Sequence, residues 1–337
     1  MDSPNKVIFY DFWWSNSKQK QGLWGLKFPA KRFSSLFQKV VETTKSKRVY
    51  IRLRNESAYS LEELVFTMLR CYECCMTVST SEELDVRLVV DVDDYVPLHR
   101  LRHITHIVSL SAEDSQEVLH GINEHRRAFS LPDLQFISLH SLGSQNSSTP
   151  SPPVGSVAHR WVPQNNRSCV GGTFDYLHEG HKVLLTATAL LAKKSIVVGV
   201  SGDPLLKNKK HAEFMQPYDT RIRNVDDFIQ EINPSLDREL FQLLDPFGPT
   251  ITDPKIEVLV LSTENKVAIT GINKKRKDAS LATISHHVVP YLLDVEKVDG
   301  YMDKVETGDL GQDITENDAF RLSSTKIRSS KGKKATL

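Results

Sequence analysis

Charge of one sign is what this 337-residue sequence most clearly lacks, since 43 Lys and Arg residues face 42 Asp and Glu residues. A chain this balanced has no basic coat for nucleic acid, so we expect no nucleic-acid partner. No apolar run reaches the about 20 residues that cross a bilayer, and residues 1–5 lack the features of a secretory signal. We therefore expect a cytoplasmic protein without a membrane partner, and we leave open that it is also nuclear.

Cysteine is scarce as well. Cys71, Cys74 and Cys75 form a cluster, and Cys169 is remote from it. A Cys-x-x-Cys pair can hold a metal or carry out redox chemistry, but no second pair is present to complete a tetrahedral site. The cluster lies in an apolar stretch of helical period, residues 61–78, so we interpret the thiols as core packing. We expect no metal site made by the protein's own side chains.

The first 140 residues alternate between strand and helix patterns, which is typical of an α/β layer fold with a largely parallel sheet. No motif in them can be tied to chemistry, so we interpret this smaller N-terminal domain as a scaffold or docking domain. The expected strands are residues 6–14, 48–53, 85–91, 106–110 and 135–139, and the expected helices are residues 33–44, 61–78 and 115–129.

A change of composition divides the chain. Residues 141–153 are rich in Ser, Pro, Asn and Gly and poor in apolar residues, so they cannot bury enough surface to order themselves. We predict a domain at 1–140, a flexible linker at 141–166, a second domain at 167–330 and a basic tail at 331–337.

The second half also alternates strands and helices, and it begins with a strand, a turn and a helix. Ligands bind at the carboxyl ends of strands in open parallel sheets, so this turn is the expected binding point. The expected strands are residues 167–170, 194–200, 255–261 and 287–293, and the expected helices are residues 178–192, 217–232 and 267–276, with a last element from Ser323. Pro290 argues for an edge position of the last strand or for a bulge in it.

The turn itself reads GGTFDYLHEGH from Gly171 to His181. Glycine lets the backbone approach an anion closely, and a helix N-terminus directs free N–H groups and positive dipole toward it. His178 and His181 are three residues apart, so they share one face of the first helical turn. Imidazoles there can donate to phosphate oxygens. The sequence therefore predicts a nucleotide-phosphate site for phosphoryl-type chemistry.

The turn resembles the GTFDxxHxGH motif of the nucleotidyltransferase superfamily, and Ser323–Arg328 resembles the ISSTxxR element of the same proteins. From Val170 to about Arg328, the chain is similar to phosphopantetheine adenylyltransferases of the eukaryotic and archaeal type. The resemblance implies a Rossmann-like α/β nucleotidyltransferase domain with a parallel sheet. It also implies transfer of the adenylyl group of ATP to pantetheine 4′-phosphate, which gives dephospho-coenzyme A and pyrophosphate.

The resemblance also implies roles for residues. His181 would contact the α-phosphate and stabilise charge as pyrophosphate leaves, and His178 would hold the ATP phosphates. On the loop after the second strand, Lys210 would neutralise the nucleophile's phosphate, with Lys207 as second choice. The other residues expected to bind ATP are Gly172, Thr173, Phe174, Gly180, Ser323, Ser324, Thr325 and Arg328.

The second substrate is expected to contact Thr173, Asp175, Lys207, Lys210, Thr263, Glu264, Asn273 and Arg276. The Thr173 hydroxyl would bind the incoming phosphate. Asp175 could bind ribose or order the turn through its own backbone, and both roles stay open. Residues 261–276 resemble the family's SEETxxGxxxN segment but depart from it at Thr263, Asn265 and Ala268. These departures change the loop that grips the adenosine or pantetheine arm.

The implied reaction needs no general base, because a phosphate monoester with a second pKa near ~6 is mostly dianionic at neutral pH. The protein has to align two anions and neutralise the transition state. Mg²⁺ would arrive with ATP, and other enzymes of the coenzyme A pathway are partners implied by the resemblance alone. Two alternatives stay open: a cytidylyl- or adenylyltransferase acting on another phosphate monoester, and a non-catalytic scaffold homologue.

Overall fold

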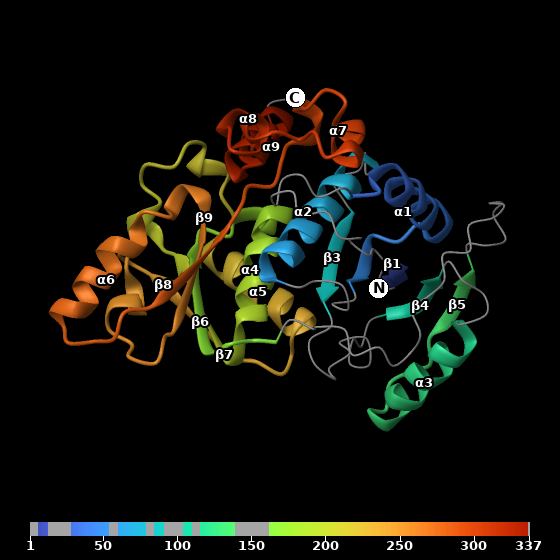
Figure 1. The fold of residues 1–337 in the computed structure, drawn as a ribbon, viewed down its shortest axis with the longest axis horizontal. Helices are drawn as coiled ribbons and strands as arrows, with labels where there is room; N and C mark the ends of the chain where they lie inside the picture. Colours follow the sequence, from blue (N-terminus) through green and yellow to red (C-terminus); the bar gives the residue numbers. More distant parts are fainter. Residues whose placement is uncertain are drawn as a thin grey trace. The chain divides into compact units, whose positions relative to one another are not determined.

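The computed structural model describes residues 6–12, 28–53, 60–78, 84–90, 104–109, 115–138 and 162–335. They form two compact units (Figure 1). The first consists of Met1–Trp161 together with Asp299–Leu310, and the second of Val162–Val298 together with Gly311–Leu337. Most of the predicted linker, residues 141–161, lies outside the described residues.

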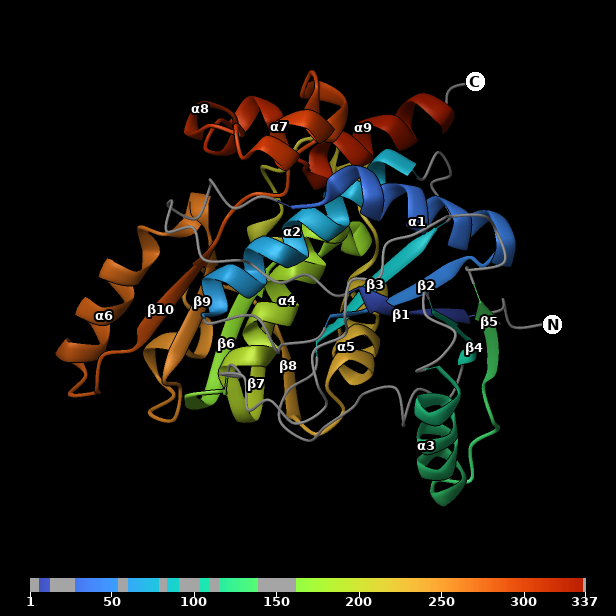
Figure 2. The same ribbon diagram turned by 45° about the vertical axis from the view of Figure 1, so that its right-hand side comes forward.

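The first unit contains a five-stranded sheet of order β3-β2-β1-β4-β5 in which every pairing is parallel. Its strands are β1 (Lys6–Phe12), β2 (Arg48–Leu53), β3 (Asp85–Val90), β4 (Ile104–Ser109) and β5 (Gln135–Ser138). Its helices are α1 (Ala30–Thr44), α2 (Leu61–Val78), α3 (Ser115–Ala128) and α7 (Tyr301–Thr307). α1 and α2 lie side by side (Figure 2). The prediction of a parallel α/β sheet is confirmed here.

The cysteine cluster lies on α2 and packs in the core of the first unit. Cys71, Cys74 and Cys75 are buried and free, as is Cys169 in the second unit. Burial raises the pKa of the Cys71 and Cys74 thiols well above its ordinary value, so both stay protonated and unreactive. Their interpretation as core packing is confirmed.

Helix α7 belongs to the first unit although it follows almost the whole second unit in the chain. It packs against α1, and it buries Tyr301 and Val305 together with Leu310 just beyond its end. The sequence predicts that all of 167–330 belongs to the second domain. The structure assigns Asp299–Leu310 to the first unit, because these apolar side chains find their packing partners there.

The second unit also contains a five-stranded parallel sheet, of order β10-β9-β6-β7-β8. Its strands are β6 (Asn165–Gly172), β7 (Ala192–Ser201), β8 (Asp237–Leu243), β9 (Val258–Ser262) and β10 (Ser285–Val289). Its helices are α4 (Glu179–Leu191), α5 (Tyr218–Ile232), α6 (Ala268–Asp278), α8 (Gln312–Thr315) and α9 (Ser324–Ala335). Because β6 is the central strand, the turn that follows it lies at the middle of the sheet's carboxyl edge.

Three details of the second unit differ from or refine the expectations. β8 was not predicted, because its alternating exposed residues at a sheet edge give no long apolar run. β10 is at the other edge, as expected, and it ends at Val289 directly before Pro290. The predicted tail from residue 331 instead continues α9 as far as Ala335. None of the described helices is long and apolar enough to cross a bilayer.

Candidate active site

The turn after β6 has an unusual backbone. Phe174, Tyr176 and Leu177 have φ values of 52°, 56° and 26°, in the left-handed region that non-glycine residues seldom adopt. Such residues persist only where the surroundings hold them, and they gather at functional sites. Gly172 is needed here, because a Cβ on it would meet the Phe174 ring at 3.0 Å.

The side chain of Arg221 in α5 fixes this turn by hydrogen bonds to backbone carbonyls. Its buried guanidinium donates to the carbonyl oxygens of Thr173 (2.7 Å), Ser201 (2.9 Å) and Gln216 (3.1 Å). These carbonyls come from the end of β6, the end of β7 and the loop before α5. One side chain thus ties the motif turn to the neighbouring strand.

The two histidines stack on each other at the start of α4. The ring centroids of His178 and His181 are 3.8 Å apart with 22° between the planes. The fully buried Phe174 ring lies 5.4 Å from the His181 ring, so it supports that imidazole, and its side chain is not available to ATP. Gly180 leaves room for the pair, because a Cβ there would lie 3.2 Å from His178 Cε1.

The second motif reaches this histidine pair. The hydroxyl oxygen of Ser324 lies 3.1 Å from His178 Nε2, across 146 residues of sequence. Ser323 caps α9, since its hydroxyl accepts the Lys326 N–H at 3.4 Å. Within the described residues, Nδ1 of His178 and of His181 has no hydrogen-bond partner. The two imidazoles, the serine hydroxyls and the N-termini of α4 and α9 therefore lie close together.

A buried ion pair lies behind the histidines. Asp175 and Arg328 are both buried, and their charged groups are 2.8 Å apart. Asp175 also accepts the Gln216 N–H at 3.0 Å, so of its two open roles it fills that of ordering the turn. Arg328 donates further to the Lys210 carbonyl (3.1 Å) and the Thr325 hydroxyl (3.2 Å). The guanidinium thus binds the protein's own groups, which argues against its expected role as a phosphate counter-charge.

The surroundings of His178 and His181 favour the neutral form of both rings, although nearby side chains carry positive charge. Burial first, and then the charges of Lys182, Arg321 and Arg328, lower the pKa of His178 to about 4 against an opposing effect of Glu179. Burial, His178 and Lys209 lower the pKa of His181 well below 6.5. Neutral imidazoles can still donate one N–H each, and the surrounding cations attract an anion such as a polyphosphate. Lys182 and Arg321 belong to no motif and were not predicted, whereas Lys209 lies between the two expected lysines of the loop after β7.

This electrostatic arrangement predicts an acid-sensitive site. In the NMR titration of the ligand-free protein, we expect the His178 ring proton to shift with a midpoint near pH 4 instead of 6.5. Because the folded pKa is the lower one, the neutral rings stabilise the fold above pH 6.5, and this stability is lost as the pH falls toward 4. Urea unfolding at pH 7 and pH 5 measures that loss. A midpoint at or above 6.5 would contradict this account.

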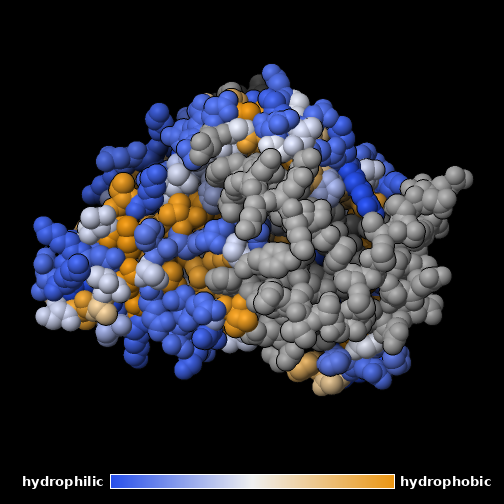
Figure 3. All heavy atoms as spheres, viewed as in Figure 1, coloured by the Kyte–Doolittle hydropathy of each residue, from blue (hydrophilic) through white to orange (hydrophobic). Residues whose placement is uncertain are grey.

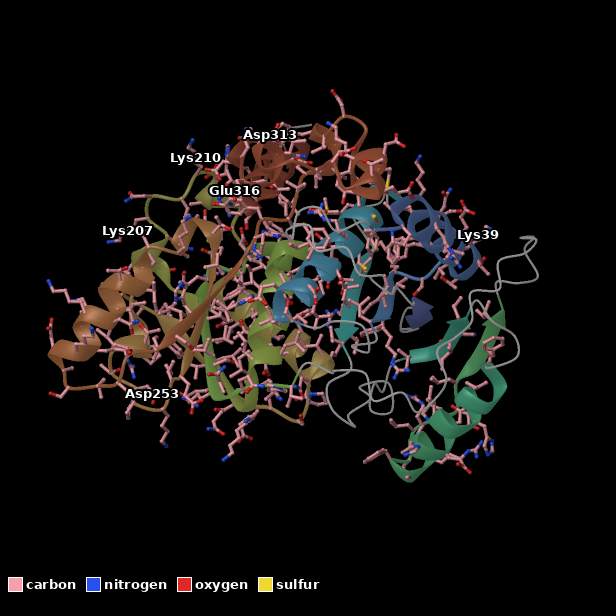
Figure 4. All side chains as sticks on the ribbon, viewed as in Figure 1. Lys39, Lys207, Lys210, Asp253, Asp313 and Glu316 are labelled. Atoms are coloured by element: carbon pink, nitrogen blue, oxygen red, sulfur yellow. The ribbon has the colours of Figure 1, made fainter. Side chains whose placement is uncertain are left out.

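The expected lysines lie on the loop after β7. Lys207 and Lys210 are exposed and lie at the same end of the sheet as the motif turn (Figure 4). Lys209 is exposed between them, and its charge reaches His181. Two further expected residues follow β9 at this end. The Thr263 hydroxyl donates to the Val289 carbonyl at 3.3 Å, and Glu264 pairs with Arg321 at 2.7 Å.

Asn273 and Arg276 do not reach the site, which corrects their assignment to substrate. Asn273 exchanges two hydrogen bonds with the backbone of Ile284. The buried Arg276 donates to the carbonyls of Ala282, Thr250 and Asp253. Asp253 lies at the opposite end of the sheet from Lys207 and Lys210 (Figure 4).

Hydrophilic residues gather over α6, as Figure 3 shows at the left, with Lys275 and Lys277 in its last turn.

Comparison with known proteins identifies the family to which this chain belongs. A family model described as cytidylyltransferase-like matches residues 169–330. The phosphopantetheine adenylyltransferase of Methanopyrus kandleri is 33% identical over 125 residues, which are 37% of this chain and 78% of that protein. The chain belongs to this nucleotidyltransferase family. The resemblance expected from the two motifs is confirmed, and the matched residues 169–330, which include Asp299–Leu310 of the first unit, form the nucleotidyltransferase domain.

Two yeast members of the family share less of their length. The phosphopantetheine adenylyltransferase of Saccharomyces cerevisiae is 38% identical over 143 residues, 42% of this chain and 47% of that protein. An uncharacterized protein of Schizosaccharomyces pombe is 37% identical over 164 residues, 49% of this chain and 48% of that protein. The chain thus matches about half the length of these two relatives.

Proposed function

We propose that the nucleotidyltransferase domain transfers the adenylyl group of ATP to 4′-phosphopantetheine, giving dephospho-coenzyme A and pyrophosphate in coenzyme A biosynthesis. The observation that carries the proposal is the 3.1 Å approach of Ser324 to His178, which brings the two motifs of the family together at the starts of α4 and α9. The relatives named phosphopantetheine adenylyltransferase support the choice of substrate.

In this reaction a phosphate oxygen of 4′-phosphopantetheine attacks the α-phosphorus of ATP, and the bond to the pyrophosphate oxygen breaks. His181 donates to the α-phosphate as charge builds up on the leaving group. His178, Ser323 and Ser324 hold the triphosphate at the starts of α4 and α9. Gly172, Thr173 and Gly180 let the backbone approach the phosphates, and Lys210 meets the incoming monoester.

Mg²⁺ is proposed to travel with ATP, held by phosphate oxygens and water, which is its usual arrangement with nucleotides. Among the described residues, no three His, Cys, Asp or Glu side chains gather into a metal site. A location in the cytoplasm, and also in the nucleus, is a proposal from the sequence, and association with other enzymes of the same pathway is a proposal from the family resemblance.

The test is an assay of the full chain with Mg²⁺, ATP or CTP, and a panel of phosphate monoesters: 4′-phosphopantetheine, flavin mononucleotide and phosphocholine. Pyrophosphate release and the nucleotidyl product are measured together. We expect turnover with ATP and 4′-phosphopantetheine. Turnover with another pair alone would support the alternative transferase, and no turnover with any pair would support the non-catalytic homologue.

The lysine loop gives a sharper prediction. We expect Lys210→Ala to raise the KM for 4′-phosphopantetheine by about 10-fold or more and to change the KM for ATP little, because a hydrogen bond to a charged group is worth about 1.5–3 kcal/mol. Lys207→Ala and Lys209→Ala, assayed in parallel, show which lysine of the loop acts.

The matched control is Lys277→Ala, an exposed lysine of the same unit in the last turn of α6. It should leave both KM values unchanged. An equal rise of both KM values in Lys210→Ala would remove Lys210 from its role at the monoester.

A further inference from the structure

The two units share a sheet topology. Starting from the first strand of each unit, the second and third strands lie on one side and the fourth and fifth on the other, in parallel throughout. In both units a described helix follows the first, the second and the fourth strand, and in the second unit α8 and α9 come after the fifth. Such an order is common among doubly wound folds, so it needs a more specific observation beside it.

The residue pairings of the two sheets can be laid side by side. In each unit one row of hydrogen-bonded neighbours crosses the whole sheet, and the two rows can be compared position by position. The rows are Val86–Val49–Val7–His106–Gln135 in the first unit and Arg238–Ile196–Ser168–Val258–Ser285 in the second. Each row runs from the third strand to the first residue of the fifth, and those two first residues, Gln135 and Ser285, are 150 positions apart.

The helix before the last strand carries the specific signature. The sequence Gly-Ile-Asn-x-x-Arg occurs at residues 121–126 and again at 271–276, and Ser-Leu follows at 130–131 and 280–281. Six of the eleven positions from 121 to 131 thus carry the same residue 150 positions further on. Ser130 and Ser280 have almost the same left-handed φ, 55° and 57°.

These repeated residues make the same bonds. Asn123 donates to the Leu134 carbonyl at 3.2 Å and accepts its N–H at 2.8 Å, and Asn273 does the same with Ile284 at 3.0 and 2.9 Å. Arg126 donates through Nε to the Pro132 carbonyl at 2.9 Å. Arg276 does so to the Ala282 carbonyl at 2.6 Å, and Pro132 and Ala282 are again 150 residues apart.

The start of the first helix differs between the units. In the second unit, α4 begins beside His178 and His181. In the first unit, α1 begins in the sequence Phe28-Pro29-Ala30-Lys31, and the first 98 residues of the chain contain no histidine. The start of α4 in the second unit thus carries the two imidazoles of the proposed phosphate site, whereas the start of α1 in the first unit has no imidazole.

Helix α7 covers that start instead. The backbone N–H of Lys31, in the first turn of α1, donates to the Glu306 carboxylate at 2.8 Å. The Phe28 N–H donates to the Val305 carbonyl at 3.4 Å. A helix N-terminus favours an anion, and at the N-terminus of α1 the Glu306 carboxylate of α7 occupies that position. In the second unit, the hydroxyl of Ser324 at the start of α9 stands in the corresponding place beside α4.

Buried polar contacts hold α7 in this position. The Tyr301 hydroxyl donates to the Glu73 carboxylate at 2.6 Å and accepts from Arg70 at 3.3 Å, while Arg70 pairs with Glu73. All three side chains are almost fully buried. Breaking a buried network of this kind leaves an unpaired charge, so α7 is a fixed part of the first unit.

We propose that the first unit is a second, non-catalytic copy of the nucleotidyltransferase domain, and that its nucleotide-binding corner binds helix α7 of the same chain in place of a triphosphate. The chain then has one nucleotide site, in the second unit.

The first test uses hydrogen exchange on the full chain, without any substrate, to measure how firmly α7 is held on the first unit. Glu306→Ala should speed the exchange of the amides of residues 28–33 and 301–307 by about tenfold or more, because it removes a charge-assisted bond at a helix start. Asp303→Ala is the matched control on the same helix. Asp303 pairs with the exposed Lys31 side chain at 2.5 Å, and an exposed pair contributes little. Unchanged exchange within α2 shows that the fold persists.

The second test counts nucleotides by equilibrium dialysis of the full chain with labelled ATP. We expect at most one ATP per chain, and none retained with the wild-type affinity in His181→Ala. Equal exchange of α7 in the Glu306 and Asp303 variants would overturn the docking. A second bound ATP that survives His181→Ala and is lost in Lys31→Ala would overturn the non-catalytic assignment. Neither readout depends on adenylyl transfer, so failure of the proposed function leaves this inference testable.

Discussion

Replacing His181 by alanine is expected to lower kcat for adenylyl transfer by on the order of 100-fold or more, because removing one transition-state hydrogen-bond donor has an effect of that size. The ring stacks on His178 and Phe174 and is half-buried, so its loss leaves the sheet and the buried ion pair intact. Single-turnover measurement with saturating ATP separates the chemical step from binding.

His286→Ala is the matched control, since it makes the same change at an exposed position of β10 in the same unit. It should have the turnover of the wild type. If His181→Ala kept full turnover with an unchanged circular dichroism spectrum, His181 would have no part in the chemistry.

Replacing Arg328 by alanine is expected to have the largest effect on stability. It leaves Asp175 buried without its 2.8 Å partner, and breaking a buried pair in this way costs about 3–5 kcal/mol. It also removes the bonds that join α9 to the Lys210 carbonyl and to Thr325. We therefore expect a lower urea midpoint together with a higher KM for ATP.

The exposed Arg223 of α5 provides the matched control, because Arg223→Ala removes the same side chain without a buried partner. The double variant Asp175→Asn with Arg328→Met should recover part of the lost stability, because it removes both charges. A loss below 1 kcal/mol in Arg328→Ala would show that Asp175 does not depend on this guanidinium.

Local patterns fixed most of the fold in advance. Residues 48–53 and 61–78 form a strand and a helix with the expected ends, because their apolar periods are strong and clear stop signals flank them. The GGTFDYLHEGH turn was readable for the same reason: glycines, a helix start and paired imidazoles are all local features. The contact of Ser324 with His178 followed only from the resemblance, since it joins residues 146 positions apart.

The features missed in the sequence depend on long-range packing. Asn273 and Arg276 look like ligand residues in a motif, but their partners are backbone groups at the far end of the sheet. The membership of α7 in the first unit has no local signal, because it depends on Glu73 and Lys31, each more than 200 residues away. A search for self-similarity at a fixed spacing would have found the Gly-Ile-Asn-x-x-Arg repeat.

The position of α7 late in the chain has a consequence for synthesis on the ribosome. Chains grow at about 5–20 residues per second, and earlier domains usually fold while later ones are still being made. Here the last strand of the first sheet ends at Ser138, but the helix that completes the unit begins at Tyr301. The nascent surface of α1 and α2 therefore waits for roughly 10–30 seconds, without Tyr301 against the Arg70–Glu73 pair, until α7 has been synthesised.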